Sequence, residues 1–184
     1  MLLALSGVTG IGKSYFKEKL VNELGFHKVN TIRTRPIRIG EKNGIDGIFI
    51  SDEQLDILKD ENKIIYDFKV FGGRYAYLKD EILSNDNMVF EMHYTMIDDW
   101  KKIRPDIKTI YILPKDIEIP KQKVKERNLS KEKEIERINE IEEQYNKFIN
   151  DKNFQSKFDY FLYNNYDKES EEQLIRLVKT ILNK

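Results

Sequence analysis

Residues 2–14 read LLALSGVTGIGKS, an apolar run followed by a glycine loop and a Lys-Ser pair. The segment from Gly7 to Ser14 fits the pattern G-x-x-x-x-G-K-[ST] at every fixed position. In this pattern, backbone N–H groups and a helix N-terminus surround phosphate oxygens. A strand before it and a helix after it favour a nucleotide-binding loop over an ordinary turn, with Lys13 on the β- and γ-phosphates and Ser14 on Mg²⁺. The loop residues expected to bind ATP are Gly7, Thr9, Gly10, Gly12, Lys13 and Ser14.

Composition favours a single α/β domain. The 184 residues are 40% hydrophobic, which is enough for a sizeable core. No run approaches ~18 consecutive apolar residues, and the start lacks the basic region of a signal peptide, so we expect a cytoplasmic protein without a membrane partner. The absence of cysteine excludes disulfides and thiolate metal sites.

Charge is balanced, with 32 basic and 32 acidic side chains. This balance argues against a surface devoted to nucleic acid, although it leaves a local basic cleft possible. One such basic stretch is TIRTRPIRIGE, residues 31–41, with three arginines in six residues. Arginine suits phosphate because its planar fork donates two parallel hydrogen bonds. A solvated basic turn is the alternative, and the loop is short enough that we expect Arg35 and Arg38 to be exposed.

Residues 88–92 predict a buried strand interrupted by Glu91. Ligands of open α/β sheets bind at the carboxyl ends of strands, so Glu91 and His93 are candidate site residues. For each, the alternative is a partly exposed polar side chain. Most charges of the helix predicted after Ser130 are interpreted as a solvated face, with Arg137 as an exception, and a capping box at Ser170 predicts the start of the C-terminal helix.

In their order along the chain, these motifs resemble the guanylate kinase family of nucleoside monophosphate kinases. Residues 34–46, TRPIRIGEKNGID, resemble the family pattern T-R-x-x-R-x-G-E-x-x-G-x-D. Residues 70–75, VFGGRY, resemble its F-G-N-Y-Y-G turn, and residues 110–114 its F-I-L-P strand. The resemblance extends over nearly the full length and includes the glycine loop.

The resemblance implies a three-layer P-loop kinase fold, a parallel core sheet with helices on both faces. Residues 1–184 would then form one guanylate kinase-like domain. A small mixed or antiparallel acceptor-binding region would occupy residues 32–83, and a helical lid residues 116–135. The core would be formed by residues 1–31, 84–115 and 136–184.

The resemblance also implies transfer of the ATP γ-phosphate, with Mg²⁺, to a nucleoside monophosphate such as GMP or dGMP. Arg35, Arg38 and Tyr75 would bind the acceptor phosphate. Lys13 and two lid arginines would neutralise the transferring group, while Glu91 would contact Mg²⁺ through water. The two lid arginines are Arg127 and Arg137, and Asn164 would contact the adenine of ATP.

The departures from the family gather in the base-binding pocket. Gly47 replaces a tyrosine, Tyr66 the glutamate that reads guanine, Tyr77 a small hydroxyl residue and His93 an aspartate. A carboxylate can accept from both guanine N1–H and N2–H₂, which one tyrosine hydroxyl cannot. Asp67 would face the other side of its strand unless a bulge re-aims it. We therefore predict relaxed guanine selectivity.

A further departure lies in the lid, where Lys123 or Lys125 replaces an arginine. Two other functions stay open at this stage. The first is a kinase for a modified base in DNA, a polynucleotide end or a non-nucleotide phosphate acceptor. The second is a binding module without catalysis. The complete glycine loop argues against the binding module, and the balanced charge argues against a DNA substrate.

Overall fold

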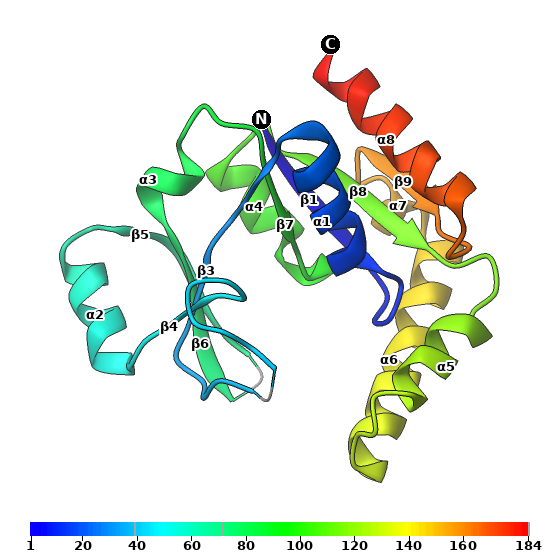
Figure 1. The fold of residues 1–184 in the computed structure, drawn as a ribbon, viewed down its shortest axis with the longest axis horizontal. Coiled ribbons are helices and arrows are strands. Elements are labelled where there is room, and N and C mark those ends of the chain that lie inside the picture. Colours follow the sequence, from blue (N-terminus) through cyan, green and yellow to red (C-terminus); the bar gives the residue numbers. More distant parts are fainter. Residues whose placement is uncertain (39, 71, 184) are drawn as a thin grey trace. The chain divides into compact units, whose positions relative to one another are not determined.

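The computed structural model describes residues 1–38, 40–70 and 72–183, and the chain divides into two compact units. The core unit comprises Met1–His27 and Asn87–Lys184, and the insert unit comprises Lys28–Asp86 (Figure 1). Ile39 of the arginine-rich motif and Phe71 of the glycine turn lie outside the described residues. None of the described helices is long and apolar enough to span a membrane.

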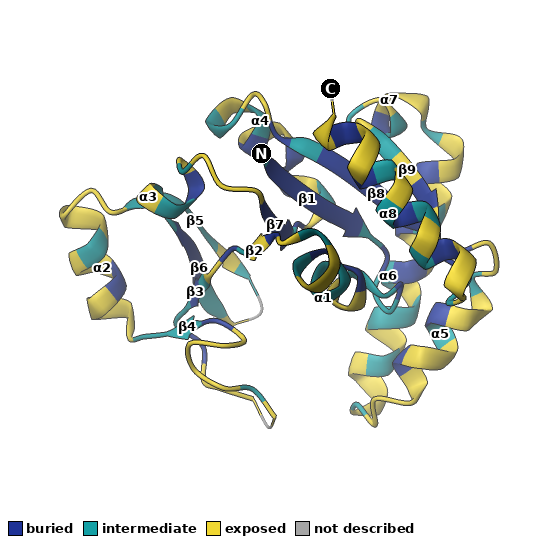
Figure 2. Ribbon diagram, turned by 45° about the horizontal axis from the view of Figure 1, so that its top comes forward, coloured by how far each residue is buried: buried dark blue, intermediate teal, exposed yellow. Residues whose placement is uncertain are grey.

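A five-stranded sheet forms the centre of the core unit, in the order β2-β7-β1-β8-β9. Strand β1 pairs in parallel with β7 and β8, and β8 pairs in parallel with β9. The central strands are almost continuously apolar and buried, as expected of a parallel sheet covered on both faces (Figure 2). The strands are β1 (Leu2–Gly7), β2 (His27–Lys28), β7 (Met88–Glu91), β8 (Lys108–Leu113) and β9 (Tyr160–Tyr163).

Helices cover both faces of this sheet, which confirms the predicted fold class. Alternate strand residues such as Leu5 pack with α1 (Lys13–Leu24) and α8 (Lys168–Leu182). On the opposite face, the Tyr111 ring of β8 stacks on Phe148 at 4.4 Å. The helices on that side are α4 (Ile97–Ile103), α6 (Lys131–Asn150) and α7 (Lys152–Gln155). A 3₁₀ turn η1 (Tyr94–Met96) precedes α4, and α5 (Glu118–Lys125) precedes α6.

The start of the C-terminal helix differs from the sequence prediction. The C-terminal helix begins at Lys168 and its N-cap is Asp167, so the capping box predicted at Ser170 is wrong. The Asp167 carboxylate accepts from the backbone N–H of Ser170 at 2.8 Å and from its hydroxyl at 2.7 Å. Ser130 is the N-cap of α6, but its side chain makes no capping hydrogen bond.

The insert unit contains a four-stranded mixed sheet in the order β4-β3-β6-β5. Strand β3 pairs in parallel with β4 and antiparallel with β6, and β5 and β6 form an antiparallel hairpin. Helix α2 begins at a capping box between Ser51 and Gln54 and packs Leu55 against one face of the sheet. The elements are β3 (Thr31–Arg33), β4 (Ile48–Phe49), α2 (Asp52–Asp60), β5 (Ile64–Val70), β6 (Gly73–Leu78) and α3 (Lys79–Ile82).

The other face of the insert sheet carries aromatic and basic side chains, and we call it the aromatic face. Its cross-strand pairs are Tyr66 with Tyr77 and Phe68 with Tyr75. The Phe68 ring lies 5.6 Å from both the Tyr66 and Tyr75 rings. Arg33 of β3 pairs with Tyr75 in register, so its side chain leaves the sheet on this same face.

Candidate active site

The glycine loop follows the carboxyl end of β1 and leads directly into α1. A Cβ on Gly7 would lie 2.2 Å from the Ile112 carbonyl oxygen, so this position requires glycine. Gly12 has a φ of 90° and a Cβ there would lie 3.0 Å from the Asn164 amide nitrogen. The loop therefore turns sharply against β8 and against Asn164, which follows β9.

Lys13 is held over this loop. Its amino group donates to the carbonyl oxygens of Gly7 and Val8, each at 2.9 Å. Burial lowers its pKa, and the nearby Arg127 and Arg137 act in the same direction, whereas Glu91 and Glu140 oppose the change. The two predicted lid arginines and Glu91 therefore lie within electrostatic range of Lys13.

Two oxygen ligands suitable for Mg²⁺ meet beside the loop. Ser14 is exposed in the first turn of α1, and its hydroxyl hydrogen-bonds with Glu91 at the end of β7. Burial raises the pKa of Glu91, but the charges of Lys17 and Lys13 and the hydrogen bonds from Lys17 and Ser14 together lower it. Glu91 is thus ionised, with Lys17 at 2.8 Å.

The two oxygen ligands, Ser14 and Glu91, suit magnesium better than a metal ion that is held by protein side chains alone. No group of three histidine, aspartate or glutamate side chains within residues 1–38, 40–70 and 72–183 could hold an ion alone. Mg²⁺ is usually bound by one or two protein oxygens, with waters and substrate phosphates completing its shell. Ser14 and Glu91 suffice for that arrangement.

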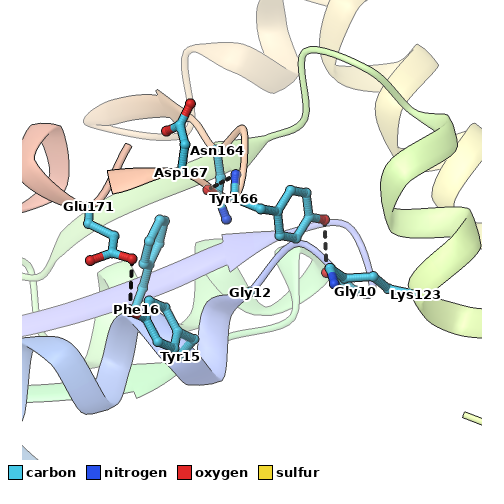
Figure 3. A pocket seen from close by; sticks show the side chains of 9 residues that line it. All are labelled: Gly10, Gly12, Tyr15, Phe16, Lys123, Asn164, Tyr166, Asp167 and Glu171. Atoms are coloured by element: carbon cyan, nitrogen blue, oxygen red, sulfur yellow. Dashed lines mark hydrogen bonds between the residues drawn. The ribbon is translucent and has the colours of Figure 1, made fainter. Parts of the chain in front are cut away.

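A cavity of about 330 Å³ opens beside the glycine loop in the core unit (Figure 3). Buried Asn164 fixes one wall, because its backbone N–H donates to Leu113 and its side-chain amide donates to the Ile11 carbonyl, each at 2.8 Å. The volume lies in the range of small-ligand sites. The cavity is lined by Gly10, Gly12, Tyr15, Phe16, Lys123, Asn164, Tyr166, Asp167 and Glu171.

Tyr166 in this cavity was missed by the sequence analysis. Its hydroxyl donates to the Gly10 carbonyl at 2.9 Å, and burial raises its pKa to about 12 (Figure 3). The Lys123 ammonium lies 5.3 Å from the centre of the Tyr166 ring, within cation–π range. Of the two lid lysines, Lys123 therefore lies at the nucleotide loop. Nothing in the residue type of Tyr166 distinguishes it from a surface tyrosine after a turn.

Glu140 on α6 was also missed. It accepts from Arg137 at 2.6 Å, from Gln144 at 2.9 Å and from the Thr9 hydroxyl at 3.4 Å. Burial opposes its ionisation, but His93, 3.8 Å away, and the hydrogen-bonded Arg137 guanidinium lower its pKa to about 2. Interpreting the charges of this helix as a solvated face was therefore wrong for Glu140. The i,i+3 spacing from Arg137 was the available signal.

The remaining candidates of the core unit are more exposed. Arg127 is exposed and lies two residues after the last residue of α5, Lys125. His93 has an exposed side chain whose Nδ1 lies 2.7 Å from the Thr95 hydroxyl and whose Nε2 lies 3.8 Å from Glu140. Through Glu140, the fold brings His93 and Arg137 to the glycine loop.

The basic stretch of the insert unit is a packed cluster centred on Glu41. Arg35 donates to the two Glu41 oxygens at 2.7 and 2.5 Å and to the Tyr75 hydroxyl at 2.9 Å. Only 7% of Arg35 is exposed, so the expectation that the short loop leaves it exposed is wrong. Arg38 is exposed as expected, and its backbone N–H donates to Glu41 at 2.9 Å.

Arg33 completes this cluster, which we call the arginine cluster (Arg33, Arg35, Arg38, Glu41 and Tyr75). Its Nη1 lies 3.3 Å from Glu41. The hydrogen bonds from Arg35 and Arg38 and the charge of Arg33 lower the Glu41 pKa to about 2. These contacts exclude the alternative that the basic stretch of residues 31–41 is a solvated turn.

The aromatic face lies beside the arginine cluster on the same side of the insert sheet. Tyr77 is buried and lies opposite Tyr66. Asp67 points to the other side of the sheet, where it pairs with Lys59 at 2.9 Å. The strand irregularity falls between Ile64 and Tyr66, before Asp67, and does not bring the carboxylate to the aromatic face.

Comparisons with known proteins agree with this arrangement. The sequence model of the family described as guanylate kinase matches residues 1–181. The guanylate kinase of Legionella pneumophila (strain Lens) is 28% identical over 184 residues, covering 96% of this chain and 84% of the relative. The guanylate kinase of Clostridioides difficile (strain 630) is 25% identical, covering 100% of this chain and 89% of the relative.

Two solved structures share the fold. The guanylate kinase from Anaplasma phagocytophilum superimposes with a TM-score of 0.69 at 20% identity, covering 100% of this chain and 85% of that one. Shikimate kinase from Bacteroides thetaiotaomicron gives a TM-score of 0.54 at 10% identity, covering 100% and 99%. Kinases named for different acceptors thus share this fold, so the acceptor has to be argued from the site.

Proposed function

The chain belongs to the guanylate kinase family of ATP-dependent nucleoside monophosphate kinases. We propose that it transfers the γ-phosphate of ATP to a nucleoside or deoxynucleoside monophosphate such as GMP or dGMP. We also propose that its selectivity for guanine is weakened. The observation that carries the proposal is the complete glycine loop, with Lys13 held over it and Ser14 beside ionised Glu91. Phosphoryl transfer needs positioning and charge neutralisation more than a general base.

The donor nucleotide is assigned to the core unit. Backbone N–H groups of the loop and the Lys13 ammonium would bind the ATP phosphates, and the cavity beside Asn164 would take the adenine. Mg²⁺, when held by Ser14 and by Glu91 through water, supplies positive charge to the phosphate oxygens. Arg127 and Arg137 would add positive charge at the transferring group, supported by their electrostatic proximity to Lys13.

The acceptor phosphate is assigned to the arginine cluster. Arg35 is already oriented by the hydrogen bond that it donates to the Tyr75 hydroxyl, and exposed Arg38 follows three residues later with its backbone N–H on Glu41. Preorganised guanidinium groups bind phosphate well because little side-chain entropy remains to be lost. This arrangement favours an acceptor that carries a terminal phosphate.

Weakened guanine selectivity follows from the aromatic face. Tyr66 presents one hydroxyl where two acceptors are needed, and Asp67 is engaged with Lys59 on the far side of the sheet. The Tyr66, Phe68 and Tyr77 rings favour recognition of a base by stacking and shape. A site that hydrogen-bonds a substrate group can discriminate by about 10⁴-fold, and most of that discrimination is lost without the acceptors.

The test is an acceptor-class assay with ATP and Mg²⁺. Nucleoside monophosphates, the matching nucleosides and a 5′-phosphorylated oligonucleotide are each incubated with the protein, and the products are separated by chromatography. We expect ADP and a nucleoside diphosphate from monophosphates alone, with Lys13→Ala as the inactive control. Transfer only to the nucleosides or the oligonucleotide, or no transfer by a protein that binds ATP, would overturn the proposal.

A further inference from the structure

Arg33 has no role among the residues assigned so far, although its guanidinium lies inside the arginine cluster. Its side chain is 20% exposed and its Nη1 reaches one Glu41 oxygen at 3.3 Å. Its Nε is buried and has no hydrogen-bond partner among the described residues. A buried N–H without a partner costs free energy, so a donor of this kind is expected to serve a ligand or an ordered water.

Gly47 explains why the guanidinium fits there. This glycine is buried, and a Cβ at its position would lie 3.2 Å from both Cζ and Nε of Arg33. Arg33 therefore fills space that a side chain at position 47 would need.

The neighbours of Arg33 hold it rigidly. Its Cζ lies 5.6 Å from the Phe49 ring centre and 5.8 Å from the Tyr75 ring centre. Contact with two rings and one carboxylate fixes the guanidinium beside Arg35, which the same Glu41 holds through two oxygens. The guanidinium groups of Arg33 and Arg35 are therefore both held at the Glu41 carboxylate.

Charge balance within the arginine cluster indicates what it binds. The guanidinium groups of Arg33 and Arg35 contact the single carboxylate of Glu41, and the exposed Arg38 adds a third positive charge, so two positive charges are uncompensated within the cluster. A phosphate monoester carries about −1.5 to −2 at neutral pH. A phosphodiester carries a single negative charge and would leave the cluster positively charged.

We propose that Arg33 is a ligand of the acceptor phosphate, and that this third guanidinium makes the arginine cluster prefer a phosphate monoester dianion over a phosphodiester. The inference rests on the proposed function for the identity of the acceptor but concerns a separate residue and a separate property. This role accounts for the buried Nε of Arg33, for the glycine at position 47 that leaves room for the guanidinium, and for the excess positive charge of the cluster.

The direct test follows the Nε–H signal of Arg33 by NMR in the full-length protein, assigned through its loss in Arg33→Lys. Inorganic phosphate and dimethyl phosphate serve as probes of the dianion and of the diester. We expect phosphate to shift the Arg33 signal at a concentration about tenfold or more below that needed for dimethyl phosphate. The Arg74 Nε–H signal, from the same sheet, should not move.

A kinetic arm uses two variants with the same change in charge. Arg33→Met should raise the KM for the accepted monophosphate about 10- to 100-fold, with the KM for ATP changed less than about twofold. Arg74→Met is the matched control, because Arg74 pairs with Asp56 at 2.7 Å outside the arginine cluster. Its monophosphate KM should stay within about twofold of wild type.

The outcomes separate this inference from the proposed function. An Arg33 signal unmoved by phosphate, or equal responses to the two probes, would overturn the inference whatever the enzyme turns over. Turnover of monophosphates with an unchanged KM in Arg33→Met would do the same. A shifted Arg33 signal without any monophosphate turnover would support the inference and overturn the proposed function.

Discussion

Replacing Arg35 with alanine should destabilise the protein far more than replacing Arg38, although both are assigned to the acceptor phosphate. Arg35 is 7% exposed and donates to Glu41, Tyr75 and the Pro36 carbonyl. Arg38→Ala removes an exposed side chain, and its backbone bond to Glu41 is retained. The two variants therefore separate binding from folding.

The expected cost of Arg35→Ala follows from the state of Glu41. Lowering the Glu41 pKa from 4.5 to about 2 corresponds to about 3 kcal/mol of preference for the ionised form. Contact with solvent reduces the stabilising part to about 1–2 kcal/mol. Losing the hydrogen bonds of Arg35 to the Tyr75 hydroxyl and the Pro36 carbonyl adds a similar amount, giving about 2–4 kcal/mol in total. Arg38→Ala should cost less than about 0.5 kcal/mol.

The assay is thermal unfolding followed by circular dichroism. Arg35→Ala should lower Tm by about 5–10 °C, and Arg38→Ala by less than about 2 °C. Both variants should raise the KM for the monophosphate while ATP binding changes little. Equal losses of Tm, or a loss of ATP affinity in place of monophosphate affinity, would refute the reasoning.

The same pair gives the stability a defined pH dependence. Since the folded Glu41 pKa is about 2 and its ordinary value is 4.5, the unfolded state binds the proton first as the pH falls. The stabilisation is therefore fully present above pH 4.5 and is lost as the pH approaches about 2. In Arg35→Ala this part of the acid transition should be reduced, and an unchanged acid profile would contradict the ion pair.

Three further predictions concern the core unit. Lys13→Ala should reduce phosphoryl transfer by about 10²-fold or more with the fold intact, and unchanged turnover would exclude the assigned role of the loop. Arg127→Ala and Arg137→Ala should each lower kcat about tenfold or more, whereas near-wild-type kcat in both would identify them as solvated helix arginines. Glu140→Gln should lower kcat severalfold without changing the monophosphate KM by more than about twofold, because Arg137 loses the carboxylate that holds it at 2.6 Å. Equal changes in both parameters would contradict this positioning role.

The sequence predicted the fold correctly where residues close together in the chain decide the local structure. The glycine loop needs a strand before it and a helix after it, and the structure has β1 and α1 there. Strand alternation also gave the direction of Asp67, which the structure places on the face opposite Tyr66. In these cases a residue's neighbours along the chain decide its environment.

The details that escaped prediction depend on contacts distant in sequence. Burial of Arg35 requires Tyr75 from another strand, and Tyr166 meets Gly10 across the carboxyl edge of the core sheet. Glu140 is one of many acidic residues on α6, and its approach to Thr9, distant in sequence, could not be read from the helix alone. At the start of α8, Asp167 and Ser170 lie three residues apart and could each cap the helix, and Asp167 prevails because it accepts two hydrogen bonds from Ser170.

The measurement that tests the account most directly is a comparison of kcat/KM across GMP, dGMP, AMP, dAMP, CMP, UMP and dTMP with ATP and Mg²⁺. The aromatic face, with Tyr66 and Tyr77 in place of an edge-reading carboxylate, predicts that GMP and dGMP exceed the best other monophosphate by no more than about 100-fold. An efficient kinase that prefers guanine by about 10⁴-fold or more would contradict the assigned base site. A protein that binds ATP but phosphorylates none of these monophosphates would contradict the proposed reaction itself.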